Sequence, residues 1–316
     1  MVPNWLWCAM AGALAVQLVQ TVHTGRTALG SPTEYPLDER TRVERFRELH
    51  GAWPPPRTYP GGRPRAATES EGWAHLMEAM ERDARSQHEH HWRWERWLEL
   101  AQMRLASNYT PSGWGTAALD PELHAEVAAA YSRGSGALEP EDAGGHIPFY
   151  IKGDRQFWSL KELPQALRRN FLAAVREAVS RFGGVAAADL EQTSVYGFRV
   201  YLNGSVLVPH VDIVETHVLS AVYCLAIEGE DPGVDPWYLE AESDFTGRRV
   251  RVDLRPGQLF LYESAKLPHG RPGTFHGRAY VALFAHFRPP DWALQNFDRV
   301  YALPADWDRT AFHGEL

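Results

Sequence analysis

Cysteine is scarce in this sequence: Cys8 and Cys224 are the two cysteines among 316 residues. Two cysteines exclude a disulfide-rich scaffold and any zinc or iron–sulfur site with four cysteine ligands. Cys224 lies in an apolar run and is predicted to be a buried thiol. If Cys8 is removed with an N-terminal signal, no internal disulfide can form, so the core must be stable through packing alone.

The sequence also lacks an excess of basic residues. Lys and Arg number 32 against 40 Asp and Glu, which gives a formal net charge of −8. A general phosphate-binding surface is therefore not expected, and we predict no nucleic-acid partner. With 44% hydrophobic and 23% charged residues, the composition is that of a globular protein. It excludes collagen-like, disordered and polytopic membrane classes for the chain as a whole.

One apolar segment stands near the start of the chain. It runs from Trp5 to Val19 and contains Gln17 as its single polar residue. Because about 20 apolar residues are needed to span a bilayer, this segment is short for a stable membrane anchor. It predicts a signal peptide within residues 1–30, with an uncleaved signal anchor as the alternative. If the signal is cleaved, no stable membrane span is expected.

The other end of the chain reads His313-Gly314-Glu315-Leu316. This resembles the Lys/His-Asp-Glu-Leu retrieval signal of the endoplasmic reticulum, with Gly in place of Asp. A retrieval signal acts only on chains that have already entered the lumen. The two ends together therefore predict a protein of the endoplasmic reticulum lumen or secretory pathway, with a membrane-anchored form as the alternative.

Composition and periodicity divide the chain into further segments. Residues 31–70 are rich in Pro, Gly and Arg and are predicted to form a linker. Residues 71–120 form a Trp-rich segment in which apolar residues recur at helical spacing. Residues 121–292 contain further helices and then the β-like runs, and residues 293–316 form a C-terminal tail. The tryptophans at 92, 94 and 97 fit helix packing better than a recognition surface, and a peptide-binding role stays open.

Two helices are predicted over 121–133 and from 160 or 164 to 182, where Gly183-Gly184 ends the second. After Gln192, short runs rich in Val, Tyr, Leu and Phe alternate with turn residues. Such spacing is typical of an antiparallel sandwich or barrel. The predicted fold class is therefore α+β, with helices first and a β core after them.

The residues with the clearest chemistry lie in the β-rich part. His210 and Asp212 end a β-like run, and residues two apart on a strand share a face. His269 supplies a third donor. Two imidazoles and one carboxylate on one side of a metal leave three positions open, as in non-haem Fe(II) oxygenases. Arg278, nine residues after His269, is placed to pair with the carboxylate of a bound dicarboxylate, and Arg271 is the alternative partner.

The segment from about 194 to 292 resembles the Fe(II)/2-oxoglutarate dioxygenases, in particular their prolyl 4-hydroxylase-like branch. Four motifs carry the resemblance: Tyr196-Gly197-Phe198-Arg199-Val200-Tyr201, Pro209-His210-Val211-Asp212, Leu254-Arg255-Pro256-Gly257 with Leu261-Tyr262, and His269 through Gly277-Arg278-Ala279-Tyr280. The resemblance implies a double-stranded β-helix, or jelly-roll, core with supporting N-terminal helices.

The resemblance also implies roles for individual residues. His210, Asp212 and His269 would hold Fe(II), Arg278 would bind the far carboxylate of 2-oxoglutarate, and Tyr201 would add a hydroxyl contact. The implied cosubstrates are 2-oxoglutarate and O2, with ascorbate as a further requirement, and no catalytic residue is expected beyond the metal centre. The implied reaction is hydroxylation coupled to conversion of 2-oxoglutarate to succinate and CO2.

Substrate identity is the least constrained part of the resemblance. Collagen-type prolyl hydroxylases have a Lys ten residues after the distal histidine, where this chain has Ala279, while an Arg at nine is similar to the oxygen-sensing type. Trp237 and Arg271 are the candidate substrate contacts. The resemblance predicts a hydroxylase of prolyl residues in peptides or proteins. The alternatives are a hydroxylase of another side chain or small molecule, a jelly-roll binding module without turnover, and a cupin-like Zn or Mn protein.

Overall fold

The computed structural model of the chain describes residues 47–48, 51, 70–87, 90–134, 138–141 and 150–304. The predicted signal segment, the linker apart from a few residues, and the retrieval-like C-terminal end lie outside the described residues. Within the described ranges, no helix is both long enough and apolar enough to cross a membrane.

The larger of two sheets has seven strands in the order β1-β10-β7-β12-β5-β4-β2, all paired antiparallel. Their bounds are β1 (Trp114–Ala118), β10 (Gln258–Tyr262), β7 (Leu219–Glu228), β12 (Ala279–Arg288), β5 (Glu191–Leu202), β4 (Arg155–Ser159) and β2 (Glu139–Pro140).

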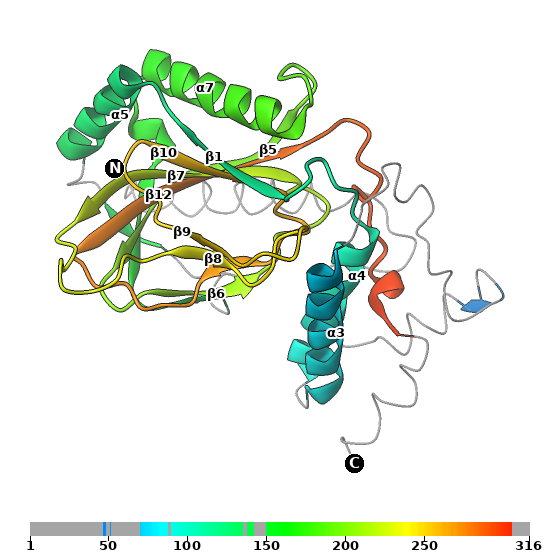
Figure 1. Ribbon diagram of the computed structural model, residues 1–316. Coiled ribbons are helices and arrows are strands. Elements are labelled where there is room, and N and C mark those ends of the chain that lie inside the picture. Colours follow the sequence, from blue (N-terminus) through cyan, green and yellow to red (C-terminus); the bar gives the residue numbers. More distant parts are fainter. Residues whose placement is uncertain are drawn as a thin grey trace, which may run out of the picture.

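The smaller sheet has five antiparallel strands in the order β3-β6-β11-β8-β9. Their bounds are β3 (Ile151–Lys152), β6 (Val206–His210), β11 (His269–Arg271), β8 (Leu239–Ala241) and β9 (Val250–Val252). The two sheets face each other in Figure 1 and enclose a core that includes Tyr201, Leu207, Leu239 and Phe260. Two facing antiparallel sheets preceded by helices confirm the predicted α+β jelly roll.

The central strand β12 explains why its sequence shows no alternation. It pairs with β5 on one side and β7 on the other, so neither edge is free. Val281 and Leu283 face a core between the sheet and the helices, whereas Tyr280 and Ala282 face the core between the two sheets. A strand buried on both faces is apolar throughout, and its period of two disappears from the sequence.

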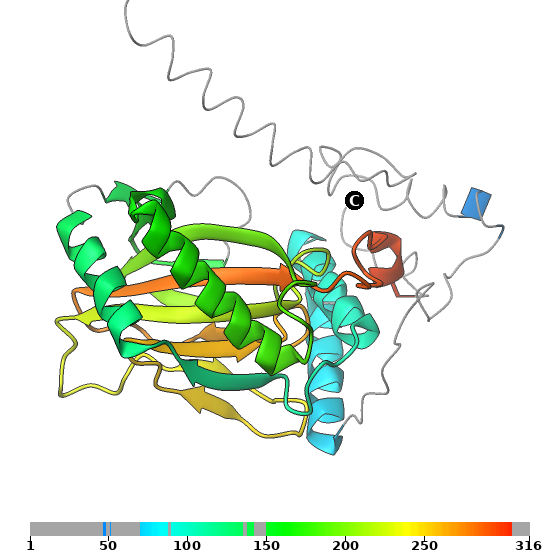
Figure 2. The ribbon, with the colours of Figure 1, turned by 90° about the horizontal axis from the view of Figure 1, so that it is seen from above.

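Two helices cover the outer face of the larger sheet, as Figures 1 and 2 show. They are α5 (Pro121–Gly134) and α7 (Gln165–Gly183), close to the predicted ranges. α7 ends at Gly184, which has a positive φ of 64° and donates its N–H to Ser180. Glycine suits this C-terminal position because a left-handed residue there carries no Cβ penalty. A short 3₁₀ helix, η3 (Leu160–Glu162), precedes α7 and accounts for the earlier predicted start.

A second helix pair packs at one end of the two sheets (Figure 1). It consists of α3 (Glu71–Ser86), capped at its N-terminus by the Ser70 side chain, and α4 (His90–Leu105). Trp94 and Trp97 are 1% and 4% exposed and belong to the core, so the packing interpretation of these two tryptophans is confirmed. The short helix η4 (Arg299–Ala302) contacts α4, which places the first part of the predicted tail against the helix pair.

Candidate metal centre

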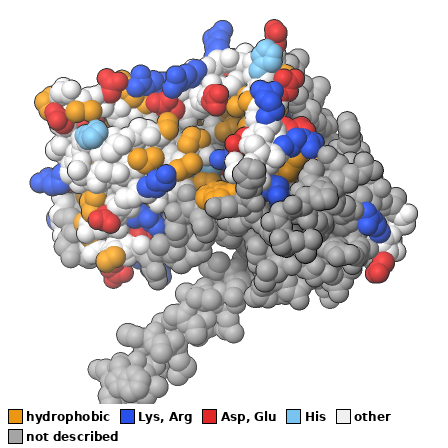
Figure 3. All heavy atoms as spheres, turned by 90° about the horizontal axis from the view of Figure 1, so that it is seen from below, with side chains coloured by type: hydrophobic (Ala, Val, Ile, Leu, Met, Phe, Trp, Pro, Cys, Tyr) orange, Lys and Arg blue, Asp and Glu red, His pale blue; other side chains and the backbone are white. Residues whose placement is uncertain are grey.

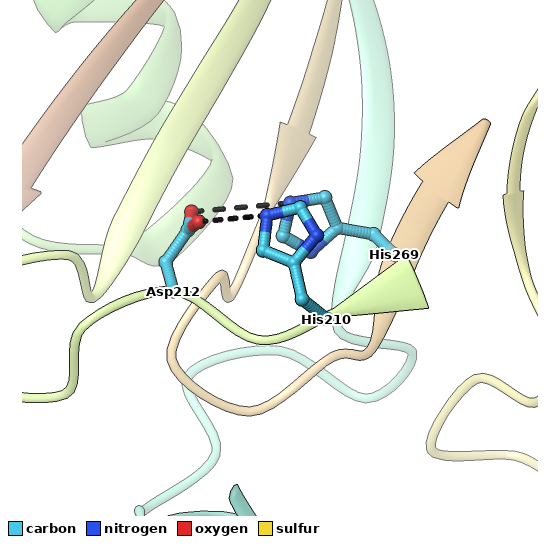
Figure 4. A group of neighbouring side chains, drawn as sticks. All are labelled: His210, Asp212 and His269. Carbon is cyan, nitrogen blue, oxygen red and sulfur yellow. Dashed lines mark ion pairs between the residues drawn. The ribbon is translucent and has the colours of Figure 1, made fainter. Parts of the chain in front are cut away.

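Three side chains with metal-binding chemistry meet between the sheets. His210 is the last residue of β6 and His269 the first of β11, and the two are directly paired across these strands. Figure 4 shows the Asp212 carboxylate facing both imidazole rings. One of its oxygens lies 3.5 Å from Nε2 of His210 and the other 3.9 Å from Nε2 of His269. The structure thus brings together the three residues that the sequence predicted as metal ligands.

A glycine lets these strands approach closely. A Cβ on Gly270 would lie 2.8 Å from the carbonyl oxygen of Leu207 and 2.8 Å from the backbone of Pro209. The pairing of β11 with β6 is irregular at this point, because His269 faces His210 while Arg271 faces Leu207. Only a residue without a side chain fits between the bulged strand and its partner.

Each imidazole is oriented by a backbone carbonyl two residues earlier in the chain. Nδ1 of His210 lies 2.8 Å from the carbonyl oxygen of Val208, and Nδ1 of His269 lies 3.0 Å from that of Leu267. A ring that donates from Nδ1 keeps the lone pair of Nε2 for a metal. The two Nε2 atoms face the Asp212 carboxylate, so the donor set is already arranged.

Electrostatics set the charge state that a metal requires at two of the three residues, His269 and Asp212. At His210 burial lowers the pKa, but the facing Asp212 outweighs burial and raises the pKa. Burial lowers the pKa of His269 to about 4, so this ring is neutral at neutral pH. Burial alone would raise the pKa of Asp212, but the facing His269 and His210 hold it well below its usual range. A neutral imidazole and an ionised carboxylate are the forms that bind a divalent cation. Two nitrogens and one oxygen on one side fit the open geometry of a non-haem Fe(II) site.

Residues from other elements hold Asp212 in place. The hydroxyl of Tyr262 donates to a carboxylate oxygen at 3.3 Å, and the Asp212 N–H donates to the carbonyl of Ser264 at 2.8 Å. The amide of Gln102, on α4, donates to the carbonyl oxygens of Asp212 and Ala265, both at 2.8 Å. Since Gln102 is 4% exposed, these bonds form away from water. The helix pair therefore supports the metal centre through one amide that joins two loops.

Gln102→Leu is expected to weaken metal binding without removing a ligand. Leucine leaves the carbonyl oxygens of Asp212 and Ala265 without their donor, so the loop that carries the carboxylate loses its position. We expect Fe(II) affinity to fall by about 10-fold or more, as loss of an outer-shell partner typically does. Anaerobic calorimetric titration with Fe(II) measures this, with the exposed Gln165→Leu on α7 as the control. Equal affinities in both variants would show that α4 does not position the ligand.

A second histidine pair lies behind the carboxylate. Nδ1 of His286, on β12, is 2.8 Å from the hydroxyl of Ser220 and 3.7 Å from a carboxylate oxygen of Asp212. Ser220 in turn pairs with Ser264 at 2.6 Å, and the ring of His217 packs on His286 with centroids 3.8 Å apart. Among the described residues, the group whose ligand atoms lie close enough to share a metal is His210, Asp212 and His269, so His286 packs behind this set as a supporting residue.

A buried arginine lies two residues beyond His269 on the same strand. Arg271 is 2% exposed and donates to the Tyr280 hydroxyl at 2.7 Å and to the Trp237 carbonyl. Its guanidinium lies over both rings, 4.4 Å from the centroid of Tyr280 and 4.8 Å from that of Trp237. Residues two apart on a strand share a face, so Arg271 points between the sheets as His269 does. Among the described residues, no carboxylate pairs with Arg271.

Arg278 does not lie where the sequence predicted. Its side chain is 77% exposed and pairs with Glu228 at 2.9 Å, and its N–H donates to the Glu228 carbonyl. β12 begins only at Ala279, so Arg278 precedes the strand and strand alternation does not direct it inward. The expected interior position of Arg278 is therefore wrong. The alternative residue, Arg271, occupies the interior.

The remaining predicted contacts lie beside Arg271. Tyr201 and Trp237 are 1% and 5% exposed, and their rings meet edge to face with centroids 5.0 Å apart. The indole N–H of Trp237 donates to the carbonyl of Gly273 at 2.7 Å. The structure thus places Trp237 as a packing residue beside the guanidinium of Arg271.

A cavity of about 760 Å³ opens beside His210, between the helix pair and the smaller sheet. This volume falls within the usual range for a ligand site, about 300–1,000 Å³. Figure 3 shows hydrophobic, basic and acidic side chains interspersed on the described part of the face seen from below. The residues that line the cavity are Leu76, Ala79, Met80, Asp83, Arg96, Glu99, Val208, Pro209, His210, Val211, Glu240, Glu242, Arg249, Pro268 and Pro272.

Fold and site together define a jelly roll with a two-histidine, one-carboxylate cluster between its sheets. No protein-family model matches the chain, and no curated protein matches it by sequence. Its structure matches solved structures of Fe(II)/2-oxoglutarate oxygenases, including prolyl hydroxylases. At the identities found, each match is a likeness of fold.

Three of these matches illustrate the likeness. A Pseudomonas putida prolyl-4-hydroxylase is 23% identical with a TM-score of 0.44, covering 56% of this chain and 93% of that one. A Trichoplax adhaerens prolyl hydroxylase, solved with a hypoxia inducible factor peptide fragment, is 14% identical with a TM-score of 0.45, covering 67% and 99%. A 2OG-Fe(II) oxygenase family oxidoreductase from Burkholderia pseudomallei is 16% identical with a TM-score of 0.38, covering 58% and 87%.

Proposed function

We propose that the chain is an Fe(II)/2-oxoglutarate-dependent dioxygenase that hydroxylates prolyl residues of peptides or proteins in the secretory pathway. The observation that carries the oxygenase part is the buried Arg271, which has no acidic partner among the described residues and lies two residues from a predicted metal ligand. A buried cation is costly unless a counter-ion reaches it. A dicarboxylate that spans from the metal centre to Arg271 would supply that counter-ion.

The chain's own residues have separate tasks in this proposal. His210, Asp212 and His269 would hold Fe(II), which together with 2-oxoglutarate supplies the activation of O2 and the decarboxylation. Arg271 would bind the far carboxylate of the cosubstrate. Tyr280 donates its hydroxyl to the Leu254 carbonyl at 3.0 Å and accepts from Arg271, which orients the guanidinium.

The aromatic side chains around Arg271 exclude water from the proposed cosubstrate site. Tyr201, Trp237 and Tyr280 are each at most 5% exposed and pack against one another. In a dry site an ion pair between guanidinium and carboxylate is stronger than in water. Tyr201, predicted as a hydroxyl contact for the cosubstrate, lies in this aromatic group and keeps that role in the proposal.

Substrate and location rest on the sequence. The motifs around the metal ligands resemble those of prolyl 4-hydroxylases, and the two ends of the chain resemble an entry and a retrieval signal of the endoplasmic reticulum. Ascorbate belongs to the proposal as a reductant that keeps the iron ferrous.

Succinate release tests the proposed reaction directly. The full chain is assayed with 2-oxoglutarate, Fe(II) and ascorbate across proline-rich peptides and proline-free controls, and hydroxylation is located by mass spectrometry. We expect succinate in amounts matching the hydroxylated proline. Succinate with hydroxylation elsewhere would keep the dioxygenase and replace the substrate. No 2-oxoglutarate turnover with any peptide, together with tight Zn(II) binding, would overturn the proposal.

A further inference from the structure

The cavity beside His210 has apolar residues on two sides and an acidic lining. The apolar lining includes Leu76 and Met80 from α3 and, on the side of the smaller sheet, Val208 from β6. The lining contains four acidic residues, Asp83, Glu99, Glu240 and Glu242, and two arginines, Arg96 and Arg249.

Both guanidiniums in this lining are already engaged. Arg96 lies 2.7 Å from Glu99 and 3.3 Å from Asp83, and Arg249 lies 2.9 Å from Glu240. Glu240 also pairs with Arg251, 3.4 Å away and outside the lining. The four carboxylates of the lining thus face three guanidiniums, and a formal charge of −1 remains. An anionic ligand would be repelled here, and a cationic one attracted.

Glu99 has a carboxylate oxygen with an unmet hydrogen bond. The residue is 4% exposed and lines the cavity from α4. Its Oε2 accepts from Arg96 at 2.7 Å, whereas its Oε1 is buried and has no hydrogen-bond partner. A buried carboxylate oxygen without a donor is costly, and a donor brought by a ligand would remove that cost.

Glu99 also lies within electrostatic reach of the metal centre. Burial, followed by the charge of Glu99, raises the pKa of Tyr150, and the Tyr150 ring stacks on His210 with centroids 4.7 Å apart. Burial likewise raises the pKa of Glu99 itself, and Arg96 only partly offsets this. A second cation near Oε1 would stabilise the ionised carboxylate. A group bound at Glu99 thus lies in the same cavity as a ligand of the metal.

We propose that this cavity binds a substrate bearing an alkylammonium or alkylguanidinium group, which pairs with the Glu99 carboxylate while its methylene stem packs on the apolar lining. The inference rests on the proposed function, because it takes the occupant of the cavity to be the molecule oxidised at the metal centre. A lysyl or arginyl side chain of a peptide has this chemistry, and so does a free alkylamine.

Binding to the metal-loaded but inactive protein tests this inference. The full chain is loaded with Zn(II) and 2-oxoglutarate and titrated calorimetrically with acetylated single-proline peptides. Each position flanking the proline is occupied in turn by a charged residue, lysine or arginine, or by its neutral counterpart, norleucine or citrulline. Pentylamine is titrated separately. We expect the charged peptides to bind about tenfold tighter than their neutral counterparts at one position, the size of one charge-assisted hydrogen bond. Tight binding of pentylamine with no peptide preference would assign the site to a free amine.

Glu99→Gln keeps the shape of the side chain and removes its charge. This variant should reduce the preference for charged ligands to less than about threefold, while Glu95→Gln, on the same helix but outside the cavity lining, should keep it. If the wild-type chain binds charged and neutral peptides equally well, the inference is overturned and no variant is needed. If Glu99→Gln leaves the preference for charged peptides unchanged, the inference is overturned as well. Succinate formation without charge preference contradicts only this inference, whereas charge preference without succinate contradicts only the proposed reaction.

Discussion

Asp212→Ala should abolish turnover of 2-oxoglutarate and reduce Fe(II) affinity by more than about 100-fold, since loss of an outer-shell partner alone typically costs 10–100-fold. Asp212 is the one carboxylate of the cluster and faces Nε2 of both His210 and His269. Alanine leaves two neutral imidazoles, which hold a hard divalent cation weakly. Metal content after dialysis and succinate formation measure the two effects.

Thermal unfolding separates lost metal binding from misfolding. A metal that binds only the folded state raises the melting temperature by mass action. Fe(II), added anaerobically, should raise the melting temperature of the wild-type chain and leave that of Asp212→Ala unchanged. The exposed Asp291→Ala should respond as the wild type does. A stabilisation of Asp212→Ala equal to that of the wild type would show that the metal binds elsewhere.

The β core could be predicted because its strands are long or rich in β-forming residues. β5, β7 and β12 each extend over ten or more residues and match runs that are visible in the sequence. The metal ligands were equally visible, because two of them lie two residues apart at a strand end. β2, β3 and β11 have two or three residues each, too few to show a period. Their pairing comes from the tertiary fold, which a local pattern does not contain.

The supporting residues on α4 carry no comparable signal. Gln102 lies 110 residues before Asp212, to which it donates, and nothing in the local sequence marks that contact. Glu99 lies three residues before Gln102 on the helix and looks like an ordinary polar residue of an amphipathic segment. Its significance depends on burial against the smaller sheet, and burial of a polar residue is a tertiary property.

Arg271 and Arg278 show where strand alternation predicts the direction of a side chain and where it does not. Arg271 is two residues after His269, so alternation alone puts the two on one face. The spacing of Arg278 from His269 resembles a family motif, and this resemblance predicts Arg278 as the carboxylate partner. That spacing places it in the turn before β12, where it pairs with Glu228 in solvent. The local rule therefore located the buried guanidinium better than the motif did.

Arg271→Gln should raise the KM for 2-oxoglutarate by about 100-fold, because truncating one partner of a buried charge pair typically costs 2–5 kcal/mol. Glutamine keeps a polar side chain but removes the charge that would face the far carboxylate. Arg271→Lys should recover part of the affinity, since it restores a cation without the two-pronged geometry. Succinate formation across a range of 2-oxoglutarate concentrations gives KM and kcat separately.

Arg278→Ala is the matched variant for this comparison, and its KM should stay within about twofold of the wild type, because a solvent-exposed ion pair contributes little. The loss of kcat/KM in Arg271→Gln should come mainly from a higher KM, since Arg271 would bind the cosubstrate away from the reacting carbon. A merely structural role would instead lower the melting temperature and kcat together, and lysine would restore neither. If Arg278→Ala raised the KM while Arg271→Gln left it unchanged, the exposed arginine would have to move inward on binding, and the motif spacing would be the better guide after all.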